Sequence, residues 1–227
     1  MKTLENLRRA LSLYVIPDRI IGAPLSLEEQ TRLALEGGAT TIQLRDKSMD
    51  GGELLATASR MASLCAKHGA LFIVNDRLDV ALLSGADGVH LGQDDLPPAE
   101  ARRMVDSLRL THRLFLIGVS AHTAHEAEQA ETGGADYLGV GATFGTDSKG
   151  NARVIGLDGL REVRMSTKLP CVAIGGITLE NLPETLGTGV DGVAVISSAV
   201  RGDVKARTAA LKARLEACQS EIKNQNN

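Results

Sequence analysis

The sequence predicts an α/β fold, a single (β/α)8 TIM barrel formed by residues 1–227. Short β-branched runs alternate with stretches whose apolar residues recur at helical spacing, and this alternation favours βαβ units around a parallel sheet. Eight such units fit 227 residues, because barrels of this kind often run to about 200–250 residues as one domain. No G-x-G-x-x-G motif follows the first strand, which counts against a doubly wound dinucleotide-binding sheet.

The expected strands are short, apolar and followed by polar residues. They cover residues 13–16, 40–44, 71–74, 88–91, 114–119, 137–140, 171–174 and 192–196. The helical patterns between them include residues 27–36, 52–67, 123–132 and 178–186. Gly-Ala and Gly-Gly-Ala-Asp phrases stand where helices should end, and glycine there suits a left-handed C-cap. The polar tail, residues 216–227, is expected to fray.

Composition and charge indicate a cytoplasmic enzyme that acts on small molecules. The net charge of -3 and the pI near 6.0 give no reason to expect a nucleic-acid partner. The three cysteines lack paired spacing, which is typical of reduced thiols. Residues 11–16 are too short for a signal peptide, and no apolar run approaches the ~20 residues of a membrane span. The oligomeric state stays open, with a homo-oligomer as one option.

Two carboxylates follow two successive strands. Asp76 comes after the strand at 71–74, and Asp95 comes after the strand at 88–91. The C-terminal ends of the strands carry the active site in α/β barrels. Mg²⁺ is commonly held by one or two carboxylates together with substrate phosphates and water. Asp76 and Asp95 are therefore candidate ligands of one Mg²⁺ ion, and phosphate sites are expected nearby.

A basic group follows the second strand. Alternation along the strand places Gln43, Arg45 and Lys47 on one face, which points inward if Leu44 points toward the helices. Arginine grips phosphate bidentately, and lysine adds a compact charge. The alternative is a solvated polar turn in which Arg45 pairs with Asp46. Burial of Gln43 within the strand argues against that alternative.

Two further loops have the composition of phosphate sites. Residues 139–152 form a glycine- and hydroxyl-rich loop that contains Lys149, and such a loop presents backbone N–H groups to a phosphate; a flexible linker is the alternative. Gly175 and Gly176 follow the seventh strand, and Ser197 follows the eighth, where it is expected to help cap a helix. Phosphates in α/β barrels often lie on the loops after strands seven and eight.

The histidines are less informative. His90 lies inside a strand, where a packed or hydrogen-bonded role is more common than metal ligation. His122 follows the fifth strand and either lines the mouth of the barrel or caps the next helix. No H-x-H, H-E-x-x-H or C-x-x-C motif occurs, so a zinc site is not expected.

In order along the chain, the strand ends resemble the thiamine-phosphate synthase family. Each matching phrase is weak alone, but seven in one order are specific and reach from the second strand to the last. They are Gln43-Leu44-Arg45-Asp46-Lys47, Asn75-Asp76-Arg77, His90-Leu91-Gly92-Gln93-Asp94-Asp95, Gly118-Val119-Ser120-Ala121-His122, Thr146-Asp147-Ser148-Lys149, Ile174-Gly175-Gly176-Ile177 and Val195-Ile196-Ser197. Members of the family condense a hydroxymethylpyrimidine diphosphate with a thiazole phosphate and release pyrophosphate.

The resemblance implies a role for each matching residue. Asp76 and Asp95 would bind Mg²⁺, and Ser120 would contact the pyrimidine. The pyrimidine diphosphate would be held by Gln43, Arg45, Lys47, Asn75 and Lys149. The thiazole phosphate would be held by Thr146, Ser148, Gly176, Ile196 and Ser197, and Gly175 is a further expected substrate-binding residue. The expected catalytic residues are Arg45, Lys47, Lys149 and Ser120.

The mechanism implied by the resemblance is dissociative. The departing pyrophosphate leaves a cation at the methylene carbon of the aminopyrimidine, and the thiazole nitrogen attacks that carbon. No protein nucleophile is required, so the enzyme positions the substrates, stabilises charge and excludes water.

The chain departs from the family pattern in one loop. The family usually has Gly-Pro where this chain has Gly141-Ala142, and Thr-x-Thr-Lys where it has Thr146-Asp147-Ser148-Lys149. Serine keeps the hydroxyl group, whereas Asp147 adds a negative charge beside the expected thiazole-phosphate site.

Two other functions are compatible with a barrel of this kind. One is a thiazole tautomerase, an isomerase in which His122 would suit proton transfer. A tautomerase does not need a second metal carboxylate, and this chain keeps Asp95 beside Asp94. The other is a non-catalytic regulator that senses thiamine metabolites, which the intact charged strand ends disfavour. Turnover by the purified protein separates it from an enzyme.

Overall fold

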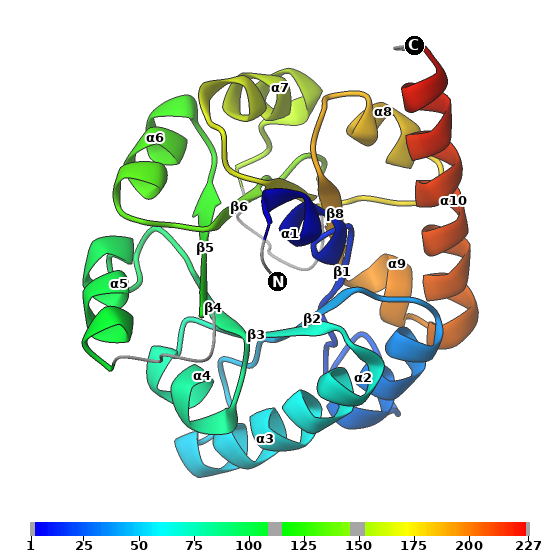
Figure 1. The fold of residues 1–227 in the computed structure, drawn as a ribbon. Coiled ribbons are helices and arrows are strands. Elements are labelled where there is room, and N and C mark those ends of the chain that lie inside the picture. Colours follow the sequence, from blue (N-terminus) through cyan, green and yellow to red (C-terminus); the bar gives the residue numbers. More distant parts are fainter. Residues whose placement is uncertain (1–2, 109–114, 146–152, 226–227) are drawn as a thin grey trace.

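The computed structural model describes residues 3–108, 115–145 and 153–225, and eight parallel strands in it close into a barrel. Neighbours in the sequence are neighbours in the barrel, and β1 (Leu13–Val15) closes the ring on β8 (Gly192–Val195). Helices surround the strands as an outer ring (Figure 1). The predicted (β/α)8 class is therefore confirmed.

The remaining elements follow the expected alternation. The other strands are β2 (Thr41–Leu44), β3 (Leu71–Asn75), β4 (Gly88–Leu91), β5 (Leu116–Ala121), β6 (Tyr137–Val140) and β7 (Cys171–Ile174). The helices are α1 (Leu4–Ala10), α2 (Leu27–Glu36), α3 (Gly51–His68), α4 (Leu78–Ser84), α5 (Pro98–Ser107), α6 (Ala124–Thr132), α7 (Gly156–Ser166), α8 (Leu182–Leu186), α9 (Ser197–Val200) and α10 (Val204–Gln225).

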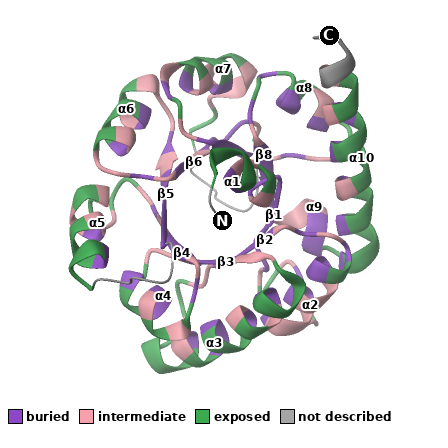
Figure 2. Ribbon diagram, in the orientation of Figure 1, coloured by how far each residue is buried: buried purple, intermediate pink, exposed green. Residues whose placement is uncertain are grey.

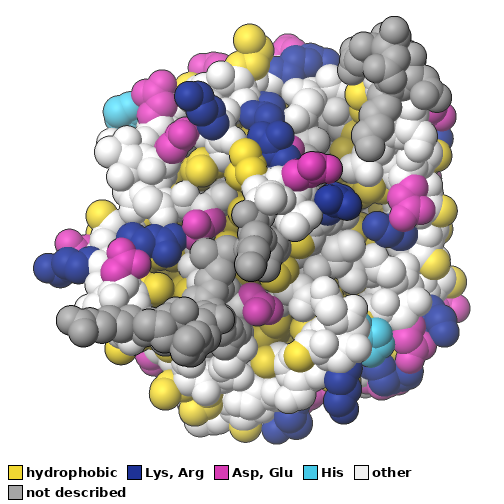
Figure 3. All heavy atoms as spheres, in the orientation of Figure 1, with side chains coloured by type: hydrophobic (Ala, Val, Ile, Leu, Met, Phe, Trp, Pro, Cys, Tyr) yellow, Lys and Arg dark blue, Asp and Glu magenta, His cyan; other side chains and the backbone are white. Residues whose placement is uncertain are grey.

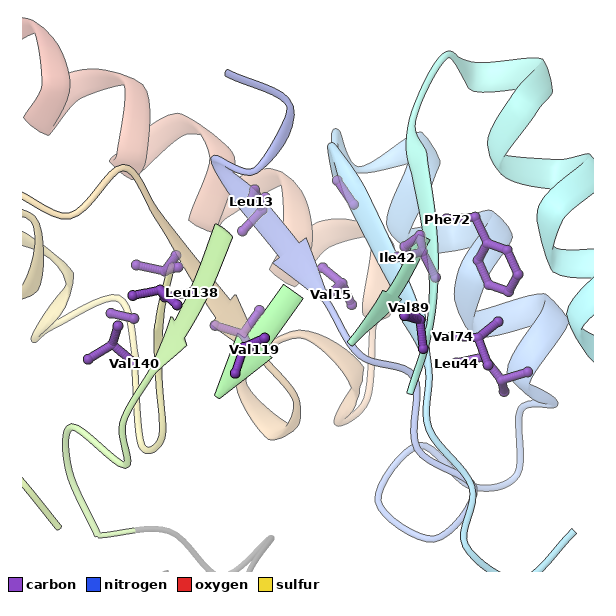
Figure 4. Packing of buried hydrophobic residues seen from close by; sticks show 14 of the residues in the cluster. Leu13, Val15, Ile42, Leu44, Phe72, Val74, Val89, Val119, Leu138 and Val140 are labelled. Carbon is purple, nitrogen blue, oxygen red and sulfur yellow. The ribbon is translucent and has the colours of Figure 1, made fainter. Parts of the chain in front are cut away.

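Alternation along the strands separates two apolar cores. Outward-facing residues such as Ile42 and Leu44 pack against the helices in the larger core (Figure 4). Inward-facing residues, among them Tyr14 and Tyr137, form a smaller core inside the barrel. The strands are accordingly buried, whereas the helices expose their outer faces (Figure 2). Helix α1 lies across one end of the barrel and contributes Leu7 to the interior core (Figure 1).

A repeated aspartate links the strands in pairs. Asp87, Asp136 and Asp191 each directly precede a strand and accept a hydrogen bond from a backbone N–H group of the preceding strand. The donors are Phe72 N at 2.8 Å, Ile117 N at 2.7 Å and Cys171 N at 2.9 Å. The Gly-Ala-Asp phrases thus combine a helix end with a carboxylate that satisfies strand backbone groups. In the pairs Gly37-Gly38 and Gly133-Gly134, which follow helices α2 and α6, the second glycine has a positive φ.

Three boundary predictions are wrong. The fifth strand, expected at residues 114–119, spans Leu116–Ala121 as β5. Helix α8 begins at Leu182 rather than at residue 178, because Asn181 Oδ1 accepts a hydrogen bond from Thr178 N and holds the preceding residues in a turn. Helix α10 includes residues 216–225, which we expected to fray. Within it, Cys218 is 2% exposed and Ile222 packs on the larger core, so this part of the helix is held by apolar contacts.

The visible face carries charges of both signs (Figure 3), and the three cysteines lie in the interior. On the face seen in Figure 3, basic and acidic side chains are interspersed without a continuous basic patch. Cys65, Cys171 and Cys218 are all buried and unbonded to one another, and burial raises the pKa of the Cys171 thiol to about 12. Among the described residues, no helix combines the length and the apolar character that a membrane crossing requires.

Candidate functional site

A cavity of about 650 Å³ lies at the carboxyl ends of the barrel strands. The residues that line it come from all eight strands or from the loops that follow them. Eleven residues singled out from the sequence line this one cavity: Gln43, Arg45, Lys47, Asn75, Asp76, Asp95, Ser120, Gly175, Gly176, Ile196 and Ser197. The other three, Thr146, Ser148 and Lys149, lie outside the described residues.

The end of β2 brings its polar residues to the cavity as alternation requires. Gln43 is buried, Arg45 is half-buried and Lys47 is exposed, while Leu44 between them packs in the outer core. The alternative of an Arg45–Asp46 turn is not observed. Asp46 instead accepts hydrogen bonds from Ser48 N and Met49 N, at 2.8 and 2.9 Å, and its other oxygen pairs with Arg19.

Asp76 and Asp95 face each other at the ends of β3 and β4. Asp76 adopts a left-handed backbone conformation with φ 62°, the single non-glycine residue with positive φ in the described ranges, and its N–H group donates to His90 O at 2.8 Å. Aspartate tolerates this conformation better than most residues. The Asp95 carboxyl is oriented by the backbone, because its Oδ2 accepts a hydrogen bond from Gly92 N at 2.7 Å.

The two carboxyl groups form an acidic pair next to one lysine. Burial and then contact with Asp95 raise the pKa of the Asp76 carboxyl, while Lys47 Nζ, 3.5 Å from Asp76 Oδ2, opposes the shift. Two carboxylates in contact repel each other unless a proton or a cation lies between them.

The donor set fits Mg²⁺. Carboxylate oxygens are the ligands that Mg²⁺ prefers, and one or two suffice because water and substrate phosphates complete its shell. Within residues 3–108, 115–145 and 153–225, no three or more His, Cys, Asp or Glu side chains are grouped to hold a metal ion. Two carboxylates by themselves are a donor set that leaves coordination positions for water and substrate phosphates.

The opposite side of the cavity is built from backbone. Gly175 and Gly176 have positive φ values of 101° and 64°, and a Cβ atom on Gly176 would lie 2.6 Å from Gly145 O. Asn181 holds this loop, because its Nδ2 donates to Gly176 O at 2.9 Å. The loop after β7 thus exposes main chain to the cavity without side chains in the way.

Helix α9 begins beside that loop, but not with the predicted cap. Ser197 is the first residue of the helix, Ile196 occupies the N-cap position, and no side-chain cap hydrogen bond forms. The prediction that Ser197 caps the helix is wrong. Ser197 and Ile196 both line the cavity, so the hydroxyl group stays available at its wall.

The histidines take defined places. His90 hydrogen-bonds Tyr137 and Ser120 inside the barrel, which is the hydrogen-bonded role predicted for it. It also lines the cavity. His122 lines the cavity and its Nδ1 lies 2.9 Å from Glu126 Oε2. Helix α6 is capped by Thr123 rather than by His122.

Several lining residues were not anticipated from the sequence. Tyr14 and Tyr137 reach the floor of the cavity from β1 and β6, and Arg153 reaches its wall from the segment before α7. Arg153 brings the basic side chains of the described lining to three, against four acidic ones, Asp76, Asp94, Asp95 and Glu126. Because positive and negative side chains are nearly equal in number, the cavity can accept a divalent cation together with anionic ligands.

Comparisons with a family model, with relatives and with a solved structure all identify the same family. A family model described as thiamine monophosphate synthase matches residues 13–199, from the start of β1 to beyond β8. The thiamine-phosphate synthase of Coprothermobacter proteolyticus is 50% identical over 200 residues, which cover 88% of this chain and 92% of that protein. Its counterpart in Pyrococcus horikoshii is 46% identical over 213 residues, covering 93% of this chain and 98% of that protein. Among solved structures, the thiamine phosphate pyrophosphorylase from Pyrococcus furiosus matches with a TM-score of 0.85 at 45% identity, over 94% of this chain and 99% of that one.

Proposed function

This chain belongs to the thiamine monophosphate synthase family, and from that premise we propose that the cavity at the barrel mouth holds both substrates of the synthase reaction side by side. The enzyme is a transferase. It joins a hydroxymethylpyrimidine diphosphate to a thiazole phosphate and forms thiamine phosphate and pyrophosphate. The observation that carries our proposal is the convergence of an acidic pair, a basic strand end and an exposed backbone loop on one cavity.

The diphosphate lies against the end of β2. Arg45 and Lys47 supply positive charge there, Asn75 supplies an amide, and all three side chains line the same cavity as Asp76, which Lys47 contacts. Lys149, which lies outside the described residues, is expected to add a further charge. Preorganised positive charge favours the departure of pyrophosphate, because negative charge grows on its oxygens as the bond breaks.

Asp76 and Asp95 hold Mg²⁺ in this proposal. When bound, the ion neutralises diphosphate oxygens and strengthens pyrophosphate as a leaving group. Asp95 is oriented for this role by Gly92 N, and Asp76 by its left-handed backbone. Lys47, 3.5 Å from Asp76, contacts the diphosphate and the acidic pair at once.

The thiazole phosphate lies on the backbone of the loop after β7. Gly176 lets the phosphate approach the main chain, and the Ser197 hydroxyl reaches the same wall. Thr146 and Ser148, outside the described residues, are proposed to complete this site. Arg153 lies near the loop after β7, and Ala142 connects the two. Ala142 N donates to Arg153 O at 3.3 Å, and the Cα atom of Ala142 lies 2.7 Å from a Cβ built on Gly175.

The pyrimidine lies between these sites, over the floor that includes Gln43 and Ser120. Departure of pyrophosphate leaves a cation at the methylene carbon, and a positioned thiazole nitrogen attacks it. The protein forms no covalent bond in this path. Its contribution is to hold the two reactants in line and to keep water away from the cation.

An assay of products tests the proposal. Purified protein incubated with both substrates and Mg²⁺ should release thiamine phosphate and pyrophosphate in equal amounts, and neither product should form when one substrate is omitted. A thiazole tautomerase would convert its substrate without forming pyrophosphate, and a regulator would bind without turnover. Either result would refute the proposed reaction.

A further inference from the structure

Five polar side chains form a continuous hydrogen-bonded chain across the inside of the barrel. Gln43 Nε2 donates to Tyr14 OH at 2.7 Å, and Tyr14 OH lies 3.1 Å from Tyr137 OH. Tyr137 OH lies 3.3 Å from His90 Nδ1. His90 Nε2 lies 3.0 Å from Ser120 Oγ. The two ends of this relay, Gln43 and Ser120, are residues that our proposed function places against the pyrimidine.

The middle of the relay lies in an apolar interior. Tyr14 is 2% exposed and Tyr137 is 1% exposed, and both belong to the interior core together with Ile73 and Leu116. Burial raises the pKa of both tyrosines above the usual range, so their hydroxyls stay neutral and each can donate and accept. A buried hydroxyl without a partner is costly, which favours an unbroken chain of hydrogen bonds.

Two glycines make room for the rings of the relay. A Cβ atom on Gly118 would lie 2.2 Å from Tyr137 Cζ, and one on Gly139 would lie 2.8 Å from His90 Cε1. Gly118 pairs with both His90 and Tyr137 in the strand register. The His90 and Tyr137 ring centroids lie 5.7 Å apart. The backbone of β5 and β6 is therefore shaped around these two rings, independently of the hydrogen bonds.

The relay has a direction. Tyr14 OH accepts the amide proton of Gln43, and its one other hydrogen-bond partner within the described residues is Tyr137 OH, so we assign the Tyr14 proton to Tyr137. In this assignment Tyr137 donates to His90 Nδ1, and a neutral His90 then carries its proton on Nε2. His90 Nε2–H donates to Ser120 Oγ, and the Ser120 proton is left to point at the cavity.

The hydrogen-bonding groups at the two ends of the relay suit an aminopyrimidine. Gln43 keeps its Oε1 as an acceptor, Ser120 presents a donor, and both residues line the cavity. An aminopyrimidine offers the complementary groups on different sides of its ring, an amino donor and two acceptor ring nitrogens. A relay of the opposite direction would present an acceptor at Ser120 and a donor at Gln43, and would mismatch both groups.

We propose that Tyr14 and Tyr137 are positioning residues, which act through His90 to set the Ser120 hydroxyl as a hydrogen-bond donor to the pyrimidine ring. The inference rests on the proposed function for the identity of the substrate. It adds two residues that touch neither phosphate and that orient the ring before the reaction begins.

The first test reads the tautomer of His90 by ¹⁵N nuclear magnetic resonance of labelled wild-type protein, with a His90→Gln variant to assign the signal. We expect the proton on Nε2. A proton on Nδ1 would overturn the relay direction, whether or not the protein turns over substrate, so this result separates the inference from the proposed function.

The second test removes one hydroxyl and keeps the ring. Tyr137→Phe should release the His90 tautomer from Nε2 and raise the Michaelis constant for the pyrimidine diphosphate about fivefold to tenfold, the range of one neutral hydrogen bond. The Michaelis constant for thiazole phosphate should stay within twofold. Tyr14→Phe, which leaves the Tyr137–His90 contact in place, should have a smaller effect in the same direction.

Ile73→Val is the matched control, because Ile73 lies in the same interior core and does not line the cavity. It should lower thermal stability without changing the His90 tautomer or the ratio of the two Michaelis constants. If Tyr137→Phe raises both constants equally, or keeps the wild-type tautomer, the tyrosine is only a packing residue. If Tyr137→Phe does not fold, the same criteria apply to Tyr14→Phe.

Discussion

Replacing Asp76 with asparagine should lower turnover sharply without making the metal-free protein less stable. Asparagine tolerates the left-handed backbone that Asp76 adopts at φ 62°, so the substitution removes a charge and leaves the backbone in place. It also removes a metal ligand next to Asp95. The functional and structural effects of the same change therefore have opposite signs, which distinguishes a site residue from a packing residue.

The magnitudes follow from the contacts of Asp76. Loss of its charge relieves the repulsion with Asp95 and removes the attraction to Lys47 at 3.5 Å. Both contacts are partly exposed, so screening limits each to about 1 kcal/mol or less, and the net change in unfolding free energy should lie between zero and about +1 kcal/mol. Loss of preorganised charge on the leaving group should cost about 3–4 kcal/mol, or ~10²–10³ in turnover.

The sign of the stability change can be checked by measuring stability at different pH values. Burial and Asp95 raise the pKa of the folded Asp76 carboxyl, so without metal the native state binds the Asp76 proton more tightly than the unfolded chain does. The wild-type protein therefore loses stability relative to Asp76→Asn as the pH rises from 3.8, the ordinary pKa of an aspartate, through the raised folded pKa. Below that window Asp76 is protonated in both states, and the two proteins should be equally stable.

Asp79→Asn is the control for this comparison. Asp79 pairs with Arg77 on the surface and does not line the cavity, and Arg77 lowers the pKa of its carboxyl. The stability that this pair adds is present above the unfolded pKa and is lost as the pH falls through the folded pKa. Asp79→Asn should therefore be slightly less stable than wild type at neutral pH and should keep full turnover.

Urea denaturation from pH 3 to pH 8 in chelator, repeated with Mg²⁺ and pyrophosphate, gives the stability data, and steady-state kinetics at varied Mg²⁺ gives turnover. Mg²⁺ with pyrophosphate should stabilise the wild type and Asp79→Asn, but not Asp76→Asn. The reasoning is refuted if Asp76→Asn keeps wild-type turnover at limiting Mg²⁺. It is also refuted if that variant is clearly less stable than wild type at neutral pH without metal.

Three further predictions concern single residues. Ser197→Ala should raise the Michaelis constant for thiazole phosphate severalfold and leave that for the diphosphate within twofold, because Ser197 lies on the wall near Gly176; equal changes in both would mean that the phosphate sites are assigned wrongly. Lys149→Ala, predicted from the sequence alone, should lower the single-turnover rate by ~10²–10³ at saturating substrates, whereas a loss confined to affinity would make Lys149 a ground-state anchor. Gly118→Ala should lower the unfolding free energy by about 1–3 kcal/mol in denaturant, since its Cβ would lie 2.2 Å from the Tyr137 ring; unchanged stability would show that the ring can move.

Much of the fold could be predicted because local pattern and fold agree. The strands at 88–91, 137–140 and 171–174 were placed with their observed bounds, since each is an apolar run that begins after a turn. Helix α2 was also placed with its observed bounds, and Ser26 Oγ caps it by accepting a hydrogen bond from Glu29 N. Helix α10 was missed as a long element because its hydrophobic residues are spaced among many charges, although Leu211, Leu215 and Cys218 form a buried stripe.

The site could be predicted in part for a different reason. Alternation along β2 was enough to place Gln43, Arg45 and Lys47 at the cavity, because the period of a strand is two. The pairing of Tyr14 with Tyr137 could not be predicted, since it joins residues 123 positions apart across the barrel. In the sequence each tyrosine reads as an ordinary apolar strand residue, and only closure of the barrel brings the hydroxyls together.

A crystal structure with Mg²⁺, pyrophosphate and thiamine phosphate bound would test the central claim most directly, namely that one cavity at the barrel mouth holds metal, diphosphate and both rings. We predict the ion on Asp76 and Asp95, pyrophosphate against Arg45 and Lys47, and the phosphate of thiamine phosphate on the main chain at Gly176. An ion held elsewhere, or pyrophosphate on the Gly176 loop, would contradict the account.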